Sequence, residues 1–261
     1  MLIMQTFGYT KTIRVLLLVA FTVVGVSSYA VAGEVNVAVA ANFLGTAKKI
    51  SSAFEQKTGH KIILSAGSTG QLYAQIRNGA PYDFFFSADS KRTAKLEKDG
   101  FVANGARFIY ALGGVALYSA EPEYVDGKGE ILRTGNFNKL AIANPKTAPY
   151  GRAAIEILDK MGLYAQLSDK LVYGQSVAQA FQFVASKAVK LGFVALSQLK
   201  EAGTNLKGSY WAVNPSLYEP IKQEAALLRK GESNKTAMEF MEFTKSAEAK
   251  KIIKTFGYTL P

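Results

Sequence analysis

The chain has 261 residues and a formal net charge of +11, with 31 lysine and arginine residues against 20 acidic ones. Hydrophobic residues make up 49% of it, enough to bury the core of one large domain or two modest ones. The absence of cysteine excludes disulfides, thiolate metal sites and cysteine nucleophiles. The basic residues are scattered, so the charge indicates solubility and a weak attraction for anions and argues against nucleic-acid binding.

Residues 1–32 have the composition of a cleavable secretory signal. Lys11 and Arg14 precede an apolar run at 15–26 that is too short to span a bilayer. Small residues follow and end in Ala30-Val31-Ala32, which is typical of a cleavage site. We therefore expect export to the periplasm with cleavage after Ala32. An uncleaved membrane anchor is the alternative.

The rest of the chain alternates short apolar runs with helical patterns, which predicts an α/β fold with largely parallel strands. The first part predicts strands at 34–40, 60–65 and 82–87 and helices at 43–57, 71–77 and 89–98. The helices stop near Gly59, Asn78-Gly79 and Gly100, as glycine favours helix ends. A long strand with two central glycines is expected at 108–118.

The second part repeats the alternation. It predicts strands at 140–143, 171–173 and 192–195 and helices at 151–161, 177–187 and 197–203. A strand-like run at 221–228 and helices at 234–244 and 247–255 follow. This order predicts two mixed α/β lobes: lobe I, residues 33–112 plus 221–261, and lobe II, residues 113–220. The crossings near Gly113-Gly114 and Pro220 predict a two-strand hinge.

Small, uncharged residues dominate the junctions at which the predicted strands pass into helices. These junctions are 40–42, 65–70, 87–89, 144–151 and 175–177. Ligands of open α/β sheets bind at the carboxyl ends of strands, where helix N-termini present unpaired N–H groups and a partial positive charge. Several such ends from two lobes would enclose a small dianion, with Asn42, Ser68, Thr69 and Tyr150 as neutral donors.

The competing interpretation is that each Ser, Thr, Asn or Asp at a helix start is simply an N-cap. Gly67 and Gly70 beside Ser68-Thr69 favour binding, because glycine lets a backbone approach a ligand and caps do not need it. The segment lacks the spacing and the lysine of a nucleotide-binding P-loop.

Signatures of an enzyme are weak. The single histidine, His60, opens a predicted strand without a Ser–Asp arrangement beside it, and Asp83 and Asp89 lack an acid/base partner. A transition-metal or calcium site has few residues from which it could be built. An exported α/β enzyme acting on phosphate or sulfate esters and a purely interacting surface protein remain alternatives to a binding protein.

The same residues resemble the periplasmic molybdate-binding proteins of ABC-type importers, a type II solute-binding protein family. The segments that carry the resemblance are 37–43, 65–76, 78–89, 143–151, 176–177, 191–195 and 257–258. The resemblance implies two lobes joined by a two-strand hinge, molybdate or tungstate as the ligand, no cofactor besides that ligand and no enzymatic activity. It also implies a membrane permease as partner, and we expect a monomer.

Carried over position by position, the ligand contacts would be Ala41, Asn42, Ser68 and Thr69 in lobe I and Tyr150 and Val177 in lobe II. Asn42 stands where many members have serine, and Ala195 stands where many have a ligand-binding tyrosine, whose hydroxyl Tyr150 would supply here. Another tetrahedral oxyanion, sulfate or phosphate, is the alternative ligand. Phosphate would need an acceptor for its proton, for which Asp89 is the candidate, although Asp89 is interpreted as a helix cap.

Overall fold

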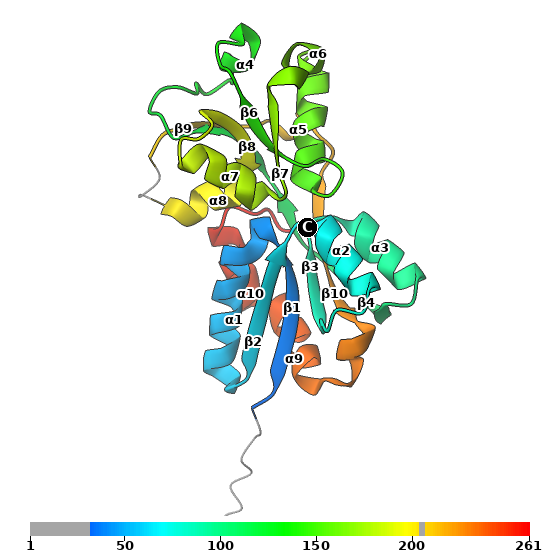
Figure 1. Ribbon diagram of the computed structural model, residues 1–261. Helices are drawn as coiled ribbons and strands as arrows, with labels where there is room; N and C mark the ends of the chain where they lie inside the picture. Colours follow the sequence, from blue (N-terminus) through cyan, green and yellow to red (C-terminus); the bar gives the residue numbers. More distant parts are fainter. Residues whose placement is uncertain (1–31, 204–206) are drawn as a thin grey trace, which may run out of the picture. The chain divides into compact units, whose positions relative to one another are not determined.

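Two five-stranded sheets organise the protein, seen in a computed structural model that describes residues 32–203 and 207–261 (Figure 1). The predicted signal at 1–32 lies outside the described residues except for Ala32, so its cleavage stays a prediction. Among the described residues, no helix combines the length and apolar character needed to cross a membrane.

The first sheet has the strand order β2-β1-β3-β10-β4 and belongs to lobe I. Its parallel part consists of β1 (Glu34–Ala40), β2 (Lys61–Gly67) and β3 (Phe84–Ser87). β10 (Ile221–Leu228) runs antiparallel both to β3 and to β4 (Val102–Gly113). Three strands therefore end together at one edge of this sheet.

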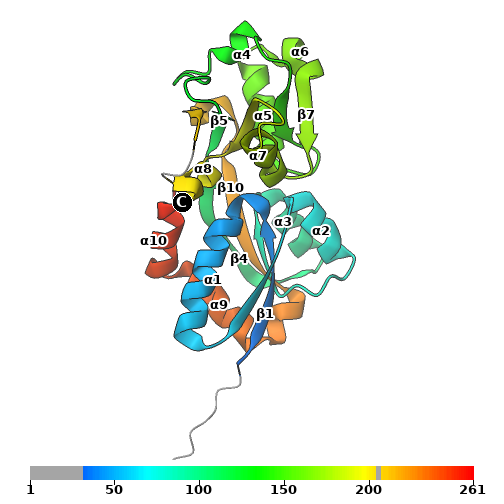
Figure 2. The same ribbon diagram turned by 60° about the vertical axis from the view of Figure 1, so that its left-hand side comes forward.

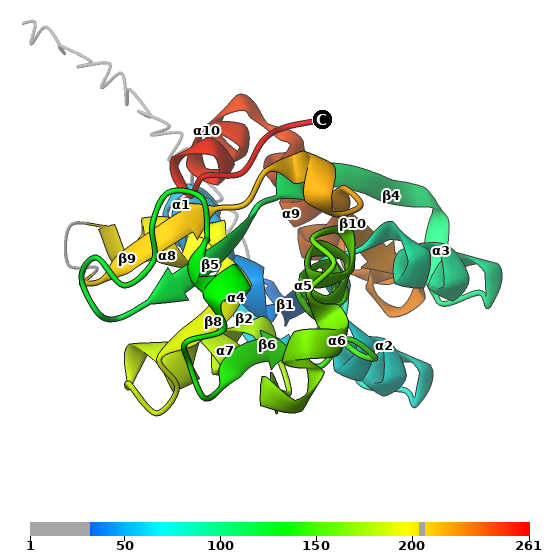
Figure 3. The same ribbon diagram turned by 90° about the horizontal axis from the view of Figure 1, so that it is seen from above.

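Helices cover both faces of the first sheet because β1 is apolar on both sides. Val35, Val37 and Val39 pack against α1 (Leu44–Thr58), α9 (Lys235–Lys245) and α10 (Ala247–Thr255). Ala38, on the other face, packs against α2 (Thr69–Arg77) and α3 (Ser90–Lys98). Figures 1 and 3 show these two groups of helices on opposite sides of the sheet.

The second sheet has the order β7-β6-β8-β5-β9 and belongs to lobe II. β6 (Leu140–Ala143) is parallel to β7 (Leu171–Gly174) and to β8 (Leu191–Ala195). β5 (Val115–Ser119) is antiparallel to β8 and to β9 (Ser209–Ala212).

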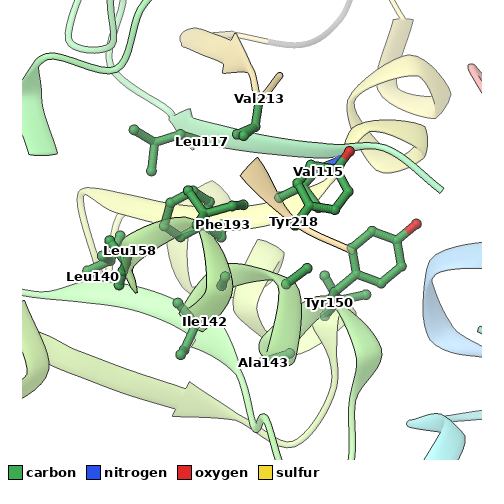
Figure 4. Packing of buried hydrophobic residues seen from close by; sticks show 14 of the residues in the cluster. Val115, Leu117, Leu140, Ile142, Ala143, Tyr150, Leu158, Phe193, Val213 and Tyr218 are labelled. Atoms are coloured by element: carbon green, nitrogen blue, oxygen red, sulfur yellow. The ribbon is translucent and has the colours of Figure 1, made fainter. Parts of the chain in front are cut away.

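Helices also cover both faces of the second sheet. One core contains residues of α4 (Ile131–Thr134), α5 (Pro149–Lys160) and α6 (Tyr164–Leu167), and Figure 4 shows part of it. The other contains residues of α7 (Val177–Ala185) and α8 (Leu196–Ala202). Short 3-10 helices complete the described chain at η1 (Ala41–Phe43), η2 (Ser168–Lys170), η4 (Pro215–Leu217) and η5 (Arg229–Ser233).

The structure confirms two mixed α/β lobes but corrects two details. The strand expected at 108–118 is two strands, because β4 ends at Gly113 in the first sheet and β5 begins at Val115 in the second. The pairings among the described strands are not largely parallel, since β4, β5, β9 and β10 all pair antiparallel. α4, α6 and β9 were not predicted, because four residues are too few to show a hydrophobic period.

The chain passes between the sheets along β4 and β10, which lie side by side (Figure 2). Ile221 at the start of β10 pairs with Gly113 at the end of β4. The lobe boundaries derived from the sequence stay a prediction, and the names lobe I and lobe II are kept for the two parts.

Candidate functional site

A small cavity lies where strand ends of both lobes turn into helices. All six residues predicted to contact a ligand line it, and none of the lining residues carries a charge. The lining residues are Ala40, Ala41, Asn42, Ser68, Thr69, Ala88, Ala148, Pro149, Tyr150, Ser176 and Val177. The lining therefore contains backbone N–H groups, hydroxyls and one side-chain amide, and no formal charge.

Thr69 is the first residue of α2, and its side chain is buried. Its Oγ1 accepts a hydrogen bond from the backbone N–H of Ala88, at 3.1 Å. Because a hydroxyl has one proton and its oxygen already accepts here, that proton can be donated to a ligand. In the first turn of α2 the Gly70 N–H donates to Thr147 and the Gln71 N–H to Ser68, so the further donor at this position is the Thr69 N–H.

Ser68 caps the start of α2, as the N-cap interpretation predicts. Its Oγ accepts from the N–H of Gln71 at 3.4 Å, while Gln71 Oε1 accepts from the Ser68 N–H at 3.2 Å. The Ser68 hydroxyl also lies 2.9 Å from Gln71 Oε1, to which it donates. The Ser68 side chain is thus engaged within its own helix start.

Lobe II contributes Tyr150 and Val177 to the lining of the cavity. Tyr150 is the second residue of α5, and Figure 4 shows its ring at the edge of the lobe II core with its hydroxyl directed away from Ile142 and Leu158. Burial, with a smaller effect of neighbouring tyrosines, raises the pKa of the Tyr150 phenol well above its usual value, so the group stays a neutral donor. Val177 begins α7, directly after the cap residue Ser176.

The side chain of Asn42 is committed to protein partners. Its Nδ2 donates to Gln223 Oε1 at 2.7 Å and to Tyr258 Oη at 3.0 Å, which uses both amide protons. The expectation that this side chain serves as a free donor is therefore wrong. The donor that Asn42 can direct to a ligand is its backbone N–H in the first turn of η1.

A buried polar layer behind the cavity was missed by sequence reasoning. Gln223 bonds Tyr110 and Tyr150 as well as Asn42, and Tyr258 Oη contacts the backbone oxygen of Asn42 at 2.8 Å and Ser197 Oγ at 3.0 Å. No signal singles out Gln223 in the sequence, because Lys222 and Glu224 beside it on β10 are polar as well.

Direct bonds between the lobes surround the cavity. The Gly70 N–H donates to the carbonyl oxygen of Thr147 at 2.8 Å, and Ser197 Oγ donates to the Asn42 carbonyl at 3.1 Å. Arg152 of lobe II lies 3.0 Å from the Asp89 carboxylate of lobe I. Gly70 was expected to allow the backbone to approach a ligand, but its close neighbour is the backbone of Thr147 in the opposite lobe.

Asp89 has the role of a helix cap, as predicted. Its Oδ1 accepts from the Arg92 N–H at 3.0 Å at the start of α3, and its Oδ2 contacts both Arg92 and Arg152. Asp89 is not among the residues that line the cavity. A protonated oxyanion would require an acceptor, and the candidate, the Asp89 carboxylate, is already paired with the guanidinium groups of Arg92 and Arg152.

His60 and Ala195, which the sequence also brought into question, are not among the residues that line the cavity. His60 Nδ1 accepts from the Gly33 N–H at 2.9 Å, and its Nε2 lies 3.3 Å from Glu239, so it serves the edge of lobe I. Ala195 is buried before α8 and is not among the lining residues. Within the described residues, no cluster of His, Cys, Asp or Glu could hold a metal ion.

The chain matches a known protein family over most of its length. The family model of the bacterial extracellular solute-binding proteins matches residues 35–259. The chain is 51% identical over 229 residues to the molybdate-binding protein ModA of Azotobacter vinelandii, covering 88% of this chain and 91% of that protein. It is 44% identical over 252 residues to the protein of the same name from Rhodobacter capsulatus, covering 96% and 98% of the two chains.

A solved structure supports the same relationship. The fold superposes on the Azotobacter vinelandii periplasmic molybdate-binding protein with a TM-score of 0.84 and 43% identity, covering 87% of this chain and 99% of that one. The family match and both alignments extend over the two lobes and the cavity between them. The chain belongs to the bacterial extracellular solute-binding proteins.

Proposed function

We propose that this protein captures molybdate, or tungstate, between its lobes and delivers it to the membrane permease of an ABC importer. The observation that carries the proposal is the uncharged cavity at the helix starts of both lobes. Two relatives at 51% and 44% identity, which are named as molybdate-binding proteins, support the choice of ligand.

Each of the six candidate contacts has a role in this proposal. The backbone N–H groups of Ala41 and Asn42, the N–H and hydroxyl of Thr69, the Tyr150 hydroxyl and the Val177 N–H donate to the oxyanion oxygens. Ser68 holds the start of α2 in place through its cap. Helix N-termini favour negative charge, so the site needs no lysine or arginine beside the ligand. Molybdenum enters as the centre of the bound oxyanion, and the protein requires no resident cofactor.

The donor-rich lining supports selection by protonation state. Molybdate, tungstate and sulfate carry no proton at neutral pH, whereas hydrogen phosphate has an O–H that needs an acceptor. Burying that group unpaired costs about 1–3 kcal/mol. Asp89, the nearby carboxylate that could accept it, is paired with Arg92 and Arg152. Sulfate has shorter bonds to oxygen than molybdate, so its oxygens would reach the fixed donors less well.

Titration calorimetry of the processed protein tests the proposal at neutral pH. We expect molybdate and tungstate to bind within about tenfold of each other, sulfate at least about a hundredfold more weakly and phosphate more weakly still, on the scale of a few lost hydrogen bonds to charged groups. Tight phosphate binding that Asp89→Asn abolishes would instead assign the protein to phosphate uptake. Absence of binding to all four anions would refute oxyanion capture.

We further propose that the protein acts as a monomer in the periplasm after cleavage behind Ala32. The secretory composition of 1–32 and the extracellular description of the family support this location. Mass measurement of the exported protein should give a chain that begins near Gly33. A mass that retains Met1 would contradict cleavage, and a concentration-dependent dimer in sedimentation would contradict the monomer.

A further inference from the structure

Gln223 is a fully buried glutamine on β10, close to the point at which the chain crosses between the lobes. It pairs with Ala111 of β4, two residues from the pair formed by Ile221 and Gly113. Burying a primary amide is unfavourable unless its hydrogen-bonding groups find partners. The partners of Gln223 include two residues of the cavity.

The oxygen and the nitrogen of the Gln223 side-chain amide form hydrogen bonds with different lobes. Its Oε1 accepts from Asn42 Nδ2 at 2.7 Å and from Tyr110 Oη at 3.1 Å, both in lobe I. Its Nε2 donates to Tyr150 Oη of lobe II at 3.4 Å. The orientation of the amide is set by Asn42, because an NH₂ group cannot accept a bond from another NH₂ group.

This orientation determines what Tyr150 can offer to the cavity. Gln223 Nε2 can only donate, so the Tyr150 oxygen accepts from it and the single phenolic proton must be directed elsewhere. Thr69 is prepared in the same way by the N–H of Ala88. The hydroxyls of Thr69 and Tyr150 are thus both set to donate to a ligand.

The backbone at Gly113 leaves room for this contact. A β-carbon at position 113 would lie 2.4 Å from Tyr150 Oη and 2.7 Å from Gln223 Nε2. Any side chain there would therefore clash with both the tyrosine hydroxyl and the glutamine amide. The hinge end of β4, the buried amide and the cavity hydroxyl form one packed unit.

We propose that Gln223 is a positioning residue for ligand specificity: it directs the Tyr150 hydroxyl to donate, which suits the cavity to oxyanions that carry no proton. The inference rests on the proposed function. It predicts that the effect of Gln223 on affinity passes through Tyr150. A merely structural residue would act whether or not that hydroxyl is present.

A double-mutant cycle measures this dependence by molybdate calorimetry. Gln223→Met keeps the volume and removes both polar ends, and we expect it to weaken binding about three- to tenfold, as for one misdirected hydrogen bond. In a Tyr150→Phe background the same change should alter affinity less than about twofold, because the coupling is lost. Equal losses in both backgrounds would overturn the proposal.

Gln198→Met is the matched control. Gln198 is also buried, and its Oε1 accepts from the Ala195 N–H at 3.0 Å at the start of α8. This variant should bind molybdate like the parent. A loss equal to that of Gln223→Met would show that any buried glutamine matters in the same way, and would count against the proposal.

Gln223→Glu tests the direction of the hydroxyl separately. A carboxylate accepts from Tyr150, so the phenolic oxygen would turn its lone pairs towards the cavity and could accept from hydrogen phosphate. The added charge repels molybdate and hydrogen phosphate alike. The ratio of molybdate to phosphate affinity, measured by displacement, should therefore fall about tenfold or more, on the scale of one reversed hydrogen bond. An unchanged ratio would overturn the proposal.

Molybdate binding by the parent protein distinguishes a failure of the proposed function from a failure of the role of Gln223. If it fails to bind molybdate, the proposed function fails. If it binds molybdate but the cycle is additive, only the role of Gln223 fails. Thermal unfolding of each variant with and without molybdate confirms that the compared proteins are folded.

Discussion

At the scale of single residues, the direction of each hydrogen bond matters more than the identity of the polar group. Thr69 and Tyr150 accept bonds from Ala88 N–H and Gln223 Nε2, so both keep a proton for a ligand. Asn42, which looks like the stronger donor, has both amide protons engaged. A polar side chain that lines a cavity is therefore a ligand donor only if its partners leave it one.

Removing either free hydroxyl should weaken molybdate binding. Thr69→Val and Tyr150→Phe each delete one bond to a charged oxygen, which corresponds to about 1.5–3 kcal/mol, or roughly 10- to 150-fold in affinity. Calorimetry measures the change. Unchanged affinity in both variants would mean that the ligand is bound elsewhere.

Matched controls exist in each lobe. Thr244 is buried and its hydroxyl donates to the Phe240 carbonyl at 2.9 Å, while buried Tyr118 donates to the Lys207 carbonyl at 2.8 Å. Thr244→Val and Tyr118→Phe should lose some stability and keep the affinity of the parent.

At the scale of elements, the start of α2 meets the loop before α5. The Gly70 N–H donates to the Thr147 carbonyl, and a β-carbon at position 70 would lie 2.9 Å from both Cα and O of Thr147. Backbone atoms cannot yield as a side chain can. Glycine at this position is thus required by the approach of the two lobes.

Gly70→Ala should weaken molybdate binding because the lobes could no longer approach as closely. Overpacking of this kind costs about 1–3 kcal/mol, which corresponds to roughly 5- to 150-fold in affinity. Calorimetry gives the affinity, and small-angle scattering should show a smaller contraction on ligand addition than in the parent. Gly127→Ala is the control, since nothing lies within 4 Å of its added carbon. Parent-like binding by Gly70→Ala would show that this contact does not limit closure.

At the scale of the whole molecule, buried tyrosines join the C-terminal end of lobe I to the cavity and to lobe II. Burial raises the pKa of Tyr258 to about 12 from a reference value of 10.0, opposed by its bonds to Ser197, Asn42 and Gln223. Burial also raises the pKa of Tyr110 and of Tyr150 well above the usual value. The folded protein therefore holds these phenols in the neutral form.

Stability should decline in alkaline solution over a defined window. The raised pKa means that the contribution of Tyr258 is complete below pH 10 and is lost between pH 10 and about 12, where the unfolded chain ionises first. Tyr258 should account for a loss of roughly 1 kcal/mol in the free energy of unfolding between about pH 9 and about pH 11. Denaturant unfolding of the parent and of Tyr258→Phe measures it, and the variant should show a shallower decline. Parallel curves would contradict this assignment.

The sequence by itself determined most of the helices and strands and nominated the residues of the candidate site. β1, β6, β10 and α10 have the bounds that their hydrophobic periods predict, because periodicity depends on residues a few positions apart. The caps at Ser68 and Asp89 are equally local. The junctions follow from the rule that strand ends of an α/β sheet meet at one edge, whereas the six candidate contacts came from the family resemblance; all six line the cavity.

Only the tertiary structure decided how the polar groups are used. Asn42 and Gln223 are 181 positions apart, Gln223 and Tyr150 are 73 apart, and Arg152 lies 63 positions from Asp89. No local pattern encodes such pairs, since the first joins distant segments of lobe I and the other two join the two lobes. The neighbour of Gly70 and the split of 108–118 into two strands depend on the same long-range packing. A sequence can nominate donors, but which of them keeps a free proton depends on partners that only the folded chain brings into contact.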